Sequence, residues 1–407
     1  TFLGAFDWSP DGKQILFETH LSDYGIIDVA SGAIRDLTAD NPFMPAGAYD
    51  ASGSFLWTDG GSVIVPGFAA GASGIWSLDL ETGASSEIAR WDAIHGGMQI
   101  THDGKLIVQT VTDLTGMVGL ATVDPNSAER TILFDEAEGV FTNTPTAQWE
   151  RISIERAGYT IEGFLFKPAD FDERKQYPVV VDVHGGPQGM HMYHPDGMPQ
   201  VLATNGILVV QPDPRGSTSY GRAFSEAVYD DWGYEDWKDI QGLLDHVLER
   251  PYADANRTGI HGYSYGGYMT SWAIGQTNRF KAAVCGAPCF DLESMYGTSD
   301  ISYLLGAMQW GGAPWENREW YAAHSPSSFI HNATTPTLII QGEADERCPV
   351  GQGEQMFISL HKLGVEVELA RYPGGFHGFR WTGEPAHRID ALDRSLGWFK
   401  RFLGDPA

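Results

Sequence analysis

The segment Gly262-Tyr263-Ser264-Tyr265-Gly266 constrains the fold of this chain more than any other feature. It follows a short apolar run at 258–260 and leads into 268–274, which reads as a helix. A serine flanked by glycines between a strand and a helix is typical of a sharp turn that exposes the hydroxyl. The N–H groups at the start of the helix point to the same place. We therefore predict that Ser264 is a nucleophile, with a plain glycine-rich turn as the alternative.

Two later loops can supply the partners that a serine nucleophile needs. Asp345 follows the apolar strand at 337–340, and His377 follows the strand at 365–369. Loops after strand ends are where α/β sheets gather their sites. A neutral imidazole can accept the hydroxyl proton near neutral pH, and a carboxylate fixes its tautomer. The order serine, acid, histidine is that of α/β-hydrolases, so we predict these three residues to be a catalytic triad.

A third motif precedes the serine. The β-branched run at 179–183 enters His184-Gly185-Gly186-Pro187. In esterases and lipases, a loop of this kind places a backbone N–H against the substrate carbonyl, which glycine allows the chain to approach closely. We predict that the N–H groups of Gly186 and Tyr265 form an oxyanion hole and that His184 organises the loop. A tight turn after a buried strand is the alternative interpretation.

The segment from 147 to 407 alternates apolar strands with amphipathic helices. Such alternation predicts a mostly parallel sheet that is covered on both faces. The expected strands are 178–183, 206–211, 258–262, 282–286, 338–342 and 365–372. Together with the three motifs, this pattern predicts an α/β fold with a C-terminal α/β-hydrolase domain at 147–407.

The segment from 1 to 146 contains a repeat. Asp-Gly pairs recur at 11–12, 59–60 and 103–104, which are 48 and 44 residues apart, and each precedes a pair of short strands that ends in a second turn. A period of ~40–50 residues made of short strands is typical of propeller blades. Since propellers close with ~4–8 blades, we predict a partial, N-terminally incomplete β-propeller of about three blades. We expect the chain to be the C-terminal portion of a longer, cleaved or truncated polypeptide and to associate through sheet edges with a missing N-terminal fragment. A severely reduced propeller is the alternative.

Five motifs between 148 and 403 resemble the prolyl oligopeptidase family of serine peptidases, and most of all its acylaminoacyl-peptidase-like branch. They are HGGP at 184–187, PRGSTSYG at 214–221, GYSYGGYMTSW at 262–272, GEADERCP at 342–349 and PGGFHGF at 373–379. The resemblance implies the same triad. It also implies that Arg347 binds a substrate carbonyl next to the scissile bond, the alternative being a salt bridge to a nearby acid such as Glu343.

The resemblance also bears on the substrate. In this family, the acyl-side pocket lies near the segment that here spans 290–310, so Phe290, Tyr296 and Trp310 are predicted to bind substrate, with core packing as the alternative. The implied function is cleavage of short or N-acylated peptides through an acyl-enzyme on Ser264. A carboxylesterase or amidase acting on small acyl substrates is the main alternative. The absence of a Glu-Glu doublet before residue 150 weakens a dipeptidyl-type aminopeptidase, and the filled catalytic positions disfavour an inactive interaction protein.

Composition excludes some partners. The chain has 26 basic and 53 acidic residues and a net charge of −27, which argues against nucleic acid or an anionic membrane surface as a partner. No apolar run reaches the ~20 residues that span a bilayer. A homo-oligomer stays open, and the cytoplasm is slightly favoured over a periplasmic or secreted location.

Cysteine and histidine usage predicts neither a disulfide framework nor a cofactor. The three cysteines are Cys285, Cys289 and Cys348, of which the first two flank a buried strand and read as core thiols. The pair His191 and His194 has no further ligands beside it, so no metal is expected. The predicted chemistry needs no cofactor.

Overall fold

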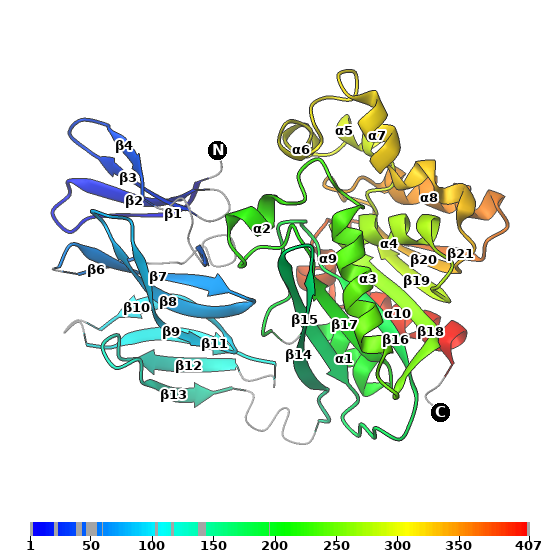
Figure 1. The fold of residues 1–407 in the computed structure, drawn as a ribbon, viewed down its shortest axis with the longest axis horizontal. Helices are drawn as coiled ribbons and strands as arrows, with labels where there is room; N and C mark the ends of the chain where they lie inside the picture. Colours follow the sequence, from blue (N-terminus) through cyan, green and yellow to red (C-terminus); the bar gives the residue numbers. More distant parts are fainter. Residues whose placement is uncertain are drawn as a thin grey trace. The chain divides into compact units, whose positions relative to one another are not determined.

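The computed structural model describes residues 3–19, 23–37, 43–45, 55–58, 60–101, 105–114, 118–136, 144–194 and 196–404. Its contacts divide the chain into two compact units (Figure 1). The first comprises 1–145 with 192–195 and 218–225, and the second comprises the remainder. None of the described helices is both long enough and apolar enough to cross a membrane.

In the first unit, the described residues between 1 and 145 are all β and form one antiparallel sheet for each repeat. The first sheet has the order β1 (Leu3–Trp8), β2 (Gln14–Thr19), β3 (Asp23–Asp28), β4 (Ile34–Asp36). The second has the order β5 (Met44–Pro45), β7 (Ser62–Ala69), β8 (Ala72–Asp79), β9 (Ser85–Trp91), and β6 (Leu56–Trp57) also pairs with β7. The third has the order β10 (Ile94–Ile100), β11 (Ile107–Thr112), β12 (Val118–Val123), β13 (Arg130–Asp135).

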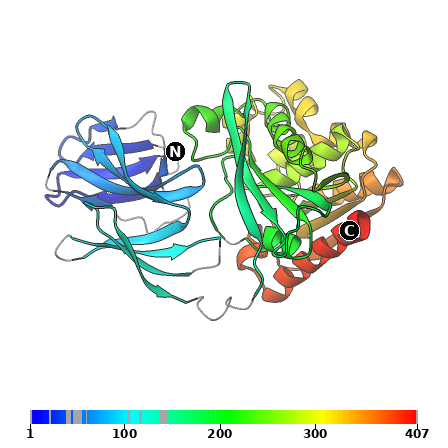
Figure 2. The same cartoon turned by 60° about the horizontal axis from the view of Figure 1, so that its bottom comes forward.

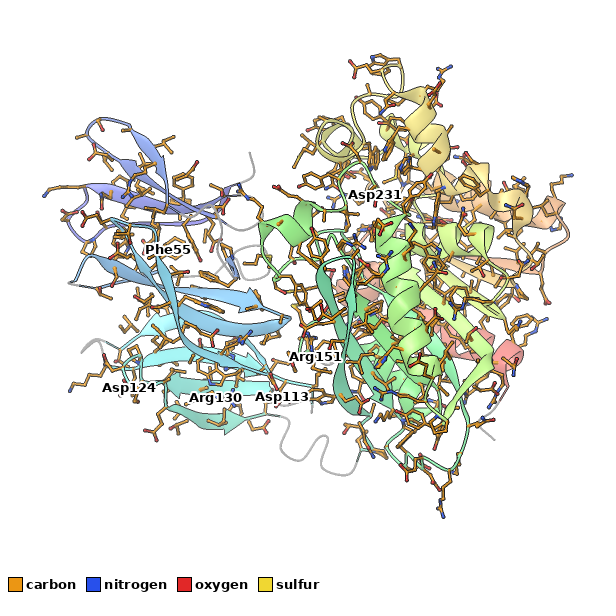
Figure 3. The ribbon with its side chains drawn as sticks, viewed as in Figure 1. Phe55, Asp113, Asp124, Arg130, Arg151 and Asp231 are labelled. Atoms are coloured by element: carbon orange, nitrogen blue, oxygen red, sulfur yellow. The ribbon has the colours of Figure 1, made fainter. Side chains whose placement is uncertain are left out.

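The sheets of the first unit pack through shared apolar layers. One layer joins the first and second sheets and includes Leu16, Tyr24 and Trp76, together with Phe55, which Figure 3 labels. Another joins the second and third sheets and includes Ile75 and Ile107, among others. This face-to-face stacking of short antiparallel sheets is the packing expected of neighbouring blades.

The repeat has a local chemical cause at the turn that follows the third strand of each sheet. There an aspartate Oδ1 accepts a backbone N–H two or three residues later, which stabilises the turn. The pairs are Asp28 with Ser31 at 2.8 Å, Asp79 with Thr82 at 2.7 Å, and Asp124 with Asn126 at 2.8 Å, and Figure 3 labels Asp124. Of the Asp-Gly pairs that revealed the repeat, 11–12 joins β1 to β2, whereas 59 and 103–104 lie outside the described residues.

The second unit is built on one eight-stranded sheet. Its strand order is β14 (Gln148–Arg156), β15 (Tyr159–Lys167), β17 (Leu208–Asp213), β16 (Tyr177–Val183), β18 (Ala253–Tyr263), β19 (Ala282–Gly286), β20 (Thr337–Gly342), β21 (Val367–Tyr372). β15 is antiparallel to both β14 and β17, and all pairs from β17 to β21 are parallel. The central strands are buried along their length, as the near-continuous apolar runs predict for a sheet with helices on both faces.

Helices cover both faces of this sheet (Figures 1 and 2). On one face lie α3 (Glu235–Leu248), α4 (Tyr265–Gln276) and α8 (Val350–Lys362). On the other lie α1 (Gly197–Thr204) and α10 (Pro385–Leu403). The shorter helices are α2 (Arg222–Glu226), α5 (Leu292–Tyr296), α6 (Ser302–Gln309), α7 (Arg318–His324) and α9 (Phe379–Thr382), with 3₁₀ turns at Pro326–Ser328 and Ile330–Asn332. The predicted fold class, an α/β-hydrolase region preceded by an all-β segment, is thus confirmed.

The strand order creates a topological switch point at the carboxyl ends of β16 and β18. β16 lies between β17 and β18, and the chain leaves β16 towards α1 on one face but leaves β18 towards α4 on the other. The loops that follow these two strands therefore diverge, and such a switch point is where open α/β sheets place their ligands. The motif at 184–187 follows β16 and Ser264 follows β18, so both motifs meet at this position.

Candidate active site

Ser264 forms the whole turn between β18 and α4. Its φ of 62° is unusual for a residue with a side chain, and its backbone N–H donates to the Gly286 carbonyl at 3.0 Å. A backbone in this region is strained and persists only because the surrounding structure holds it. The consequence is a partly exposed hydroxyl at the mouth of an otherwise buried helix.

The glycines beside Ser264 are required by backbone packing. A Cβ on Gly262 would lie 2.3 Å from the Gly266 carbonyl oxygen, and a Cβ on Gly266 would lie 2.1 Å from the Val183 carbonyl oxygen. Both distances are far below van der Waals contact, and the obstacles are main-chain atoms that cannot rotate away. The elbow thus brings α4 directly against the ends of β16 and β18.

The structure brings Ser264, Asp345 and His377 together from loops that follow β18, β20 and β21. His377 Nε2 lies 3.0 Å from Ser264 Oγ, and His377 Nδ1 lies 2.8 Å from Asp345 Oδ2. Because a carboxylate can only accept hydrogen bonds, Nδ1 carries the imidazole proton and Nε2 is left to accept from the serine hydroxyl. The arrangement can therefore remove a proton from Ser264.

Asp345 is itself fixed by its own loop. Its other oxygen, Oδ1, accepts the backbone N–H groups of Arg347 at 3.0 Å and Cys348 at 2.9 Å. The side chain is 0% exposed, so it has no freedom to turn away from the imidazole. A carboxylate held in this way orients the histidine without exchanging its own partners.

The two predicted oxyanion donors lie on either side of Ser264, with Gly186 on the loop after β16 and Tyr265 in the first turn of α4. Tyr265 is the first residue of α4, and its N–H has no carbonyl one turn earlier in the helix to bond. Gly186 has a φ of 134°, and a Cβ on its neighbour Gly185 would lie 3.5 Å from Ser264 Cβ. The loop backbone thus runs beside the nucleophile, and the role of these N–H groups stays a prediction. His184, expected to organise this loop, has its Nε2 2.8 Å from Ser217 Oγ.

A buried carboxyl group holds the side chain of Tyr265. The Tyr265 hydroxyl donates to Asp236 Oδ2, which also accepts the Gly233 N–H at 3.0 Å. Burial raises the pKa of Asp236 to about 7, although these hydrogen bonds oppose the change. Sequence reasoning missed this residue, because Asp236 reads as an ordinary acid in the first turn of a helix.

A second buried carboxyl group, that of Asp182, links neighbouring strands near the switch point. Asp182 of β16 lies opposite His261 of β18 in the sheet register and contacts its Nδ1, while Gln211 donates to the other carboxylate oxygen at 2.8 Å. His261 Nε2 lies 3.4 Å from Arg380 Nη1, in the segment that follows His377. The network ties the strands that precede the 184–187 loop and Ser264 to the loop that carries His377. The signal that the sequence offered was a charged residue inside the apolar run 179–183.

Arg347 has a different ionic partner from the one named as the alternative. Its Nε and Nη2 donate to the two oxygens of Asp300 at 2.7 and 3.1 Å. Glu343 instead pairs with Arg371 at 2.9 Å, so the suggestion of Glu343 as partner was wrong. The contact with Arg347 lowers the pKa of Asp300. Asp300 precedes α6 and is distant in sequence, which is why local reasoning selected the nearer acid.

The three aromatic residues predicted to bind substrate have different environments. Phe290 and Trp310 are buried, and Trp310 packs edge-on against Trp232 with ring centroids 5.4 Å apart. Tyr296 is partly exposed and packs edge-on against Trp315 at 5.7 Å. Phe290 and Trp310 thus contribute to the core, and a substrate-binding role for any of the three stays a prediction.

Comparison with known proteins identifies the family of this chain. A model of the prolyl oligopeptidase family matches residues 193–406, which is more than half of the chain and includes all three residues of the predicted triad. The chain belongs to the prolyl oligopeptidase family. The resemblance that the five motifs indicated is therefore confirmed.

Individual relatives agree with this family. The chain is 34% identical over 352 residues to the uncharacterized peptidase YuxL of Bacillus subtilis, covering 86% of this chain and 53% of that protein. It is 32% identical over 289 residues to dipeptidyl-peptidase 5 of Schizosaccharomyces pombe, covering 70% of this chain and 40% of that protein. A solved structure of Pyrococcus horikoshii acylaminoacyl peptidase superimposes with a TM-score of 0.80 at 26% identity, covering 98% of this chain and 70% of that one. The chain thus spans about half the length of the curated relatives it matches.

The close backbone approach at the elbow yields a first prediction. Gly262→Ala should lower the free energy of unfolding of the α/β unit by ~1–3 kcal/mol, because the new methyl group meets main-chain atoms. Urea unfolding followed by circular dichroism measures the change. Gly351→Ala in α8 is the matched control: a Cβ there meets nothing within 4 Å, and alanine should stabilise the helix by up to ~1 kcal/mol. Equal unfolding midpoints for the two variants would show that the elbow tolerates a side chain.

The Asp182 network yields a second prediction. Asp182→Ala should lower the free energy of unfolding by ~3–5 kcal/mol, since it removes one partner of a buried polar group and leaves donors from His261 and Gln211 unpaired. Glu354→Ala removes the exposed ion pair with Arg371 and should cost no more than ~1 kcal/mol. Chemical denaturation of both variants checks the difference, and a loss below 1 kcal/mol for Asp182→Ala would mean that the network is dispensable.

Proposed function

We propose that this chain carries the active site of a serine peptidase that cleaves short or N-acylated peptides through an acyl-enzyme on Ser264. The observation that carries the proposal is the unbroken hydrogen-bonded series from Ser264 through His377 to Asp345. It lies at the sheet switch point, beside Gly186 and Tyr265, whose backbone N–H groups would bind the oxyanion.

In the first half of the reaction, Ser264 Oγ attacks the carbonyl carbon of the scissile bond while His377 Nε2 takes the hydroxyl proton. Asp345 keeps the imidazole in the correct tautomer and stabilises the imidazolium. The N–H groups of Tyr265 and Gly186 donate hydrogen bonds to the carbonyl oxygen and stabilise the negative charge that develops on it. His377 then returns the proton to the departing amine, and the acyl group remains on Ser264.

In the second half, water takes the place of the amine. His377 removes a proton from the water, which attacks the acyl carbon, and then protonates Ser264 as the acid product leaves. The same steps hydrolyse esters, whose leaving group departs more readily. Esterase activity on small acyl substrates is therefore expected beside peptidase activity.

Two observations bear on the substrate. A solved acylaminoacyl peptidase, 26% identical with a TM-score of 0.79, contains the blocked peptide reagent Z-Gly-Gly-Phe-chloromethyl ketone, which favours peptides without a free amino terminus. The curated relatives include several dipeptidyl-peptidase 5 proteins, which favour a second candidate that recognises a free amino terminus. The two candidates differ only in how the amino end of the substrate is bound.

A third prediction tests the function. The chain should hydrolyse p-nitroanilides of N-acylated peptides with a higher kcat/KM than the matched dipeptides with free amino groups, and should also cleave p-nitrophenyl esters. Ser264→Ala should lower kcat by ~10⁴–10⁶ on every substrate without changing the melting temperature, because it removes a single hydroxyl. Preference for the free dipeptide would select the dipeptidyl candidate. Fluorophosphonate labelling of another serine in active protein would reject the triad.

A fourth prediction concerns Arg347. Asp300 occupies the Nε and Nη2 edge of the guanidinium, so the salt bridge and a contact from Nη1 to a substrate carbonyl are compatible. Arg347→Ala should cost ~1.5–3 kcal/mol in kcat/KM for peptides, as loss of a hydrogen bond from a charged group does. Short esters that lack the carbonyl should lose little. An equal loss on both substrate types would mean that Arg347 only braces the Asp345 loop.

Asp300→Ala is the matched variant for this experiment. If Asp300 orients Arg347, its removal should also lower kcat/KM for peptides, by less than Arg347→Ala, and should act mainly on KM. Asp300→Glu should restore part of the loss, because it keeps a carboxylate for the guanidinium. A gain in peptide activity in Asp300→Ala would mean that the salt bridge competes with substrate.

A further inference from the structure

Two of the three cysteines meet next to the nucleophile. Cys289 follows β19 and Cys348 follows β20, and their Sγ atoms lie 3.5 Å apart. Both are buried as free thiols. Sequence reasoning assigned Cys289 to the core and gave it no partner, because the two residues are far apart in the chain.

The thiols contact Ser264, and the backbone of Cys348 contacts Asp345. Cys348 Sγ lies 3.9 Å from Ser264 Oγ, and Cys289 Sγ lies 3.8 Å from the Ser264 carbonyl oxygen. The backbone N–H of Cys348 also donates to Asp345 at 2.9 Å. Any movement that brings the two sulfurs together therefore displaces the groups around the nucleophile and the loop that fixes the acid.

We propose that Cys289 and Cys348 form a reversible disulfide under peroxide, and that this bond switches off the active site. The inhibitory effect rests on the proposed function of Ser264, whereas formation of the bond does not. Ser264 is partly exposed and its Oγ lies 3.9 Å from Cys348 Sγ, so a small oxidant that reaches the nucleophile comes close to this buried thiol.

The chemistry balances with hydrogen peroxide as the oxidant. One thiol, as its thiolate, attacks a peroxide oxygen; the O–O bond breaks, and a sulfenic acid and one water result. The second thiol attacks the sulfenic sulfur, the S–O bond breaks, and a second water leaves. Two thiols and one peroxide thus give one disulfide and two waters. An added dithiol reverses the step by exchange.

The expected loss of activity follows from the geometry. A disulfide needs an S–S distance of about 2.05 Å, so the sulfurs must approach each other by roughly 1.5 Å. Misplacing catalytic groups by about 1 Å can cost roughly 100-fold in rate. The hydrogen bond between the two thiols and their burial raise the pKa of Cys348, so little thiolate is present at neutral pH and oxidation should be slow.

The experiment treats the 407-residue chain with hydrogen peroxide and follows two readouts in parallel. Mass spectrometry of peptides prepared without reductant should find Cys289 linked to Cys348. Esterase activity should fall roughly 100-fold and return with dithiothreitol. Fluorophosphonate labelling of Ser264 should fall and recover with the same time course. An absence of the linked peptide overturns the proposal, and so does a linked enzyme that keeps its activity.

Three serine variants provide the controls, each compared with its own untreated activity. Cys289→Ser and Cys348→Ser should form no such link, and dithiothreitol should restore no activity after peroxide. Cys285→Ser should behave as the parent chain, because the Cys285 thiol donates to the Gly267 carbonyl at 3.1 Å and belongs to neither contact. Reversible inactivation that persists in Cys289→Ser would overturn the proposal. A chain that forms the link but never hydrolyses any substrate would instead contradict the proposed function.

Discussion

The close approach of α4 to the ends of β16 and β18 is the constraint on which the rest of the site depends. Gly266 lies so close to the Val183 carbonyl that no side chain fits, and Gly262 lies as close to Gly266. This contact sets where the helix begins, and therefore where the Ser264 hydroxyl and the Tyr265 N–H point. The loops after β20 and β21 then need only reach the same end of the sheet to bring Asp345 and His377 to Ser264.

Polar groups inside the sheet define the arrangement around this contact. Asp182 and His261 face each other across the two strands that diverge at the switch point, and Arg380 extends their network towards the histidine loop. Asp236 of α3 accepts a hydrogen bond from the Tyr265 hydroxyl and so fixes that side chain at the start of α4. Buried groups of this kind contribute less to stability than apolar packing would, but they accept few geometries. They suit a site whose function depends on exact placement.

The parts of the structure that the sequence could predict are those whose cause is local. The elbow, the turns at Asp28 and Asp79, and the loops that carry Asp345 and His377 each follow from a few adjacent residues. The pairing of Arg347 with Asp300 and of Cys289 with Cys348 could not be predicted, because each joins segments about 50 residues apart or more whose approach depends on the folded sheet. The same holds for the burial of Trp310, because the aromatic and apolar composition of the segment 290–310 suited a substrate pocket and a core equally well.

The raised pKa of Asp236 has a consequence for the energetics of folding. An acid with an ordinary value of 3.8 that titrates near 7 in the native state takes up a proton as the chain folds at intermediate pH. Its contribution to stability is fully present below pH 3.8 and is lost as the pH rises towards 7. Acids with a lowered pKa, such as Asp300, act in the opposite sense. Calorimetric unfolding between these pH values will therefore release this proton into the buffer, and the measured enthalpy will depend on the ionisation enthalpy of the buffer chosen.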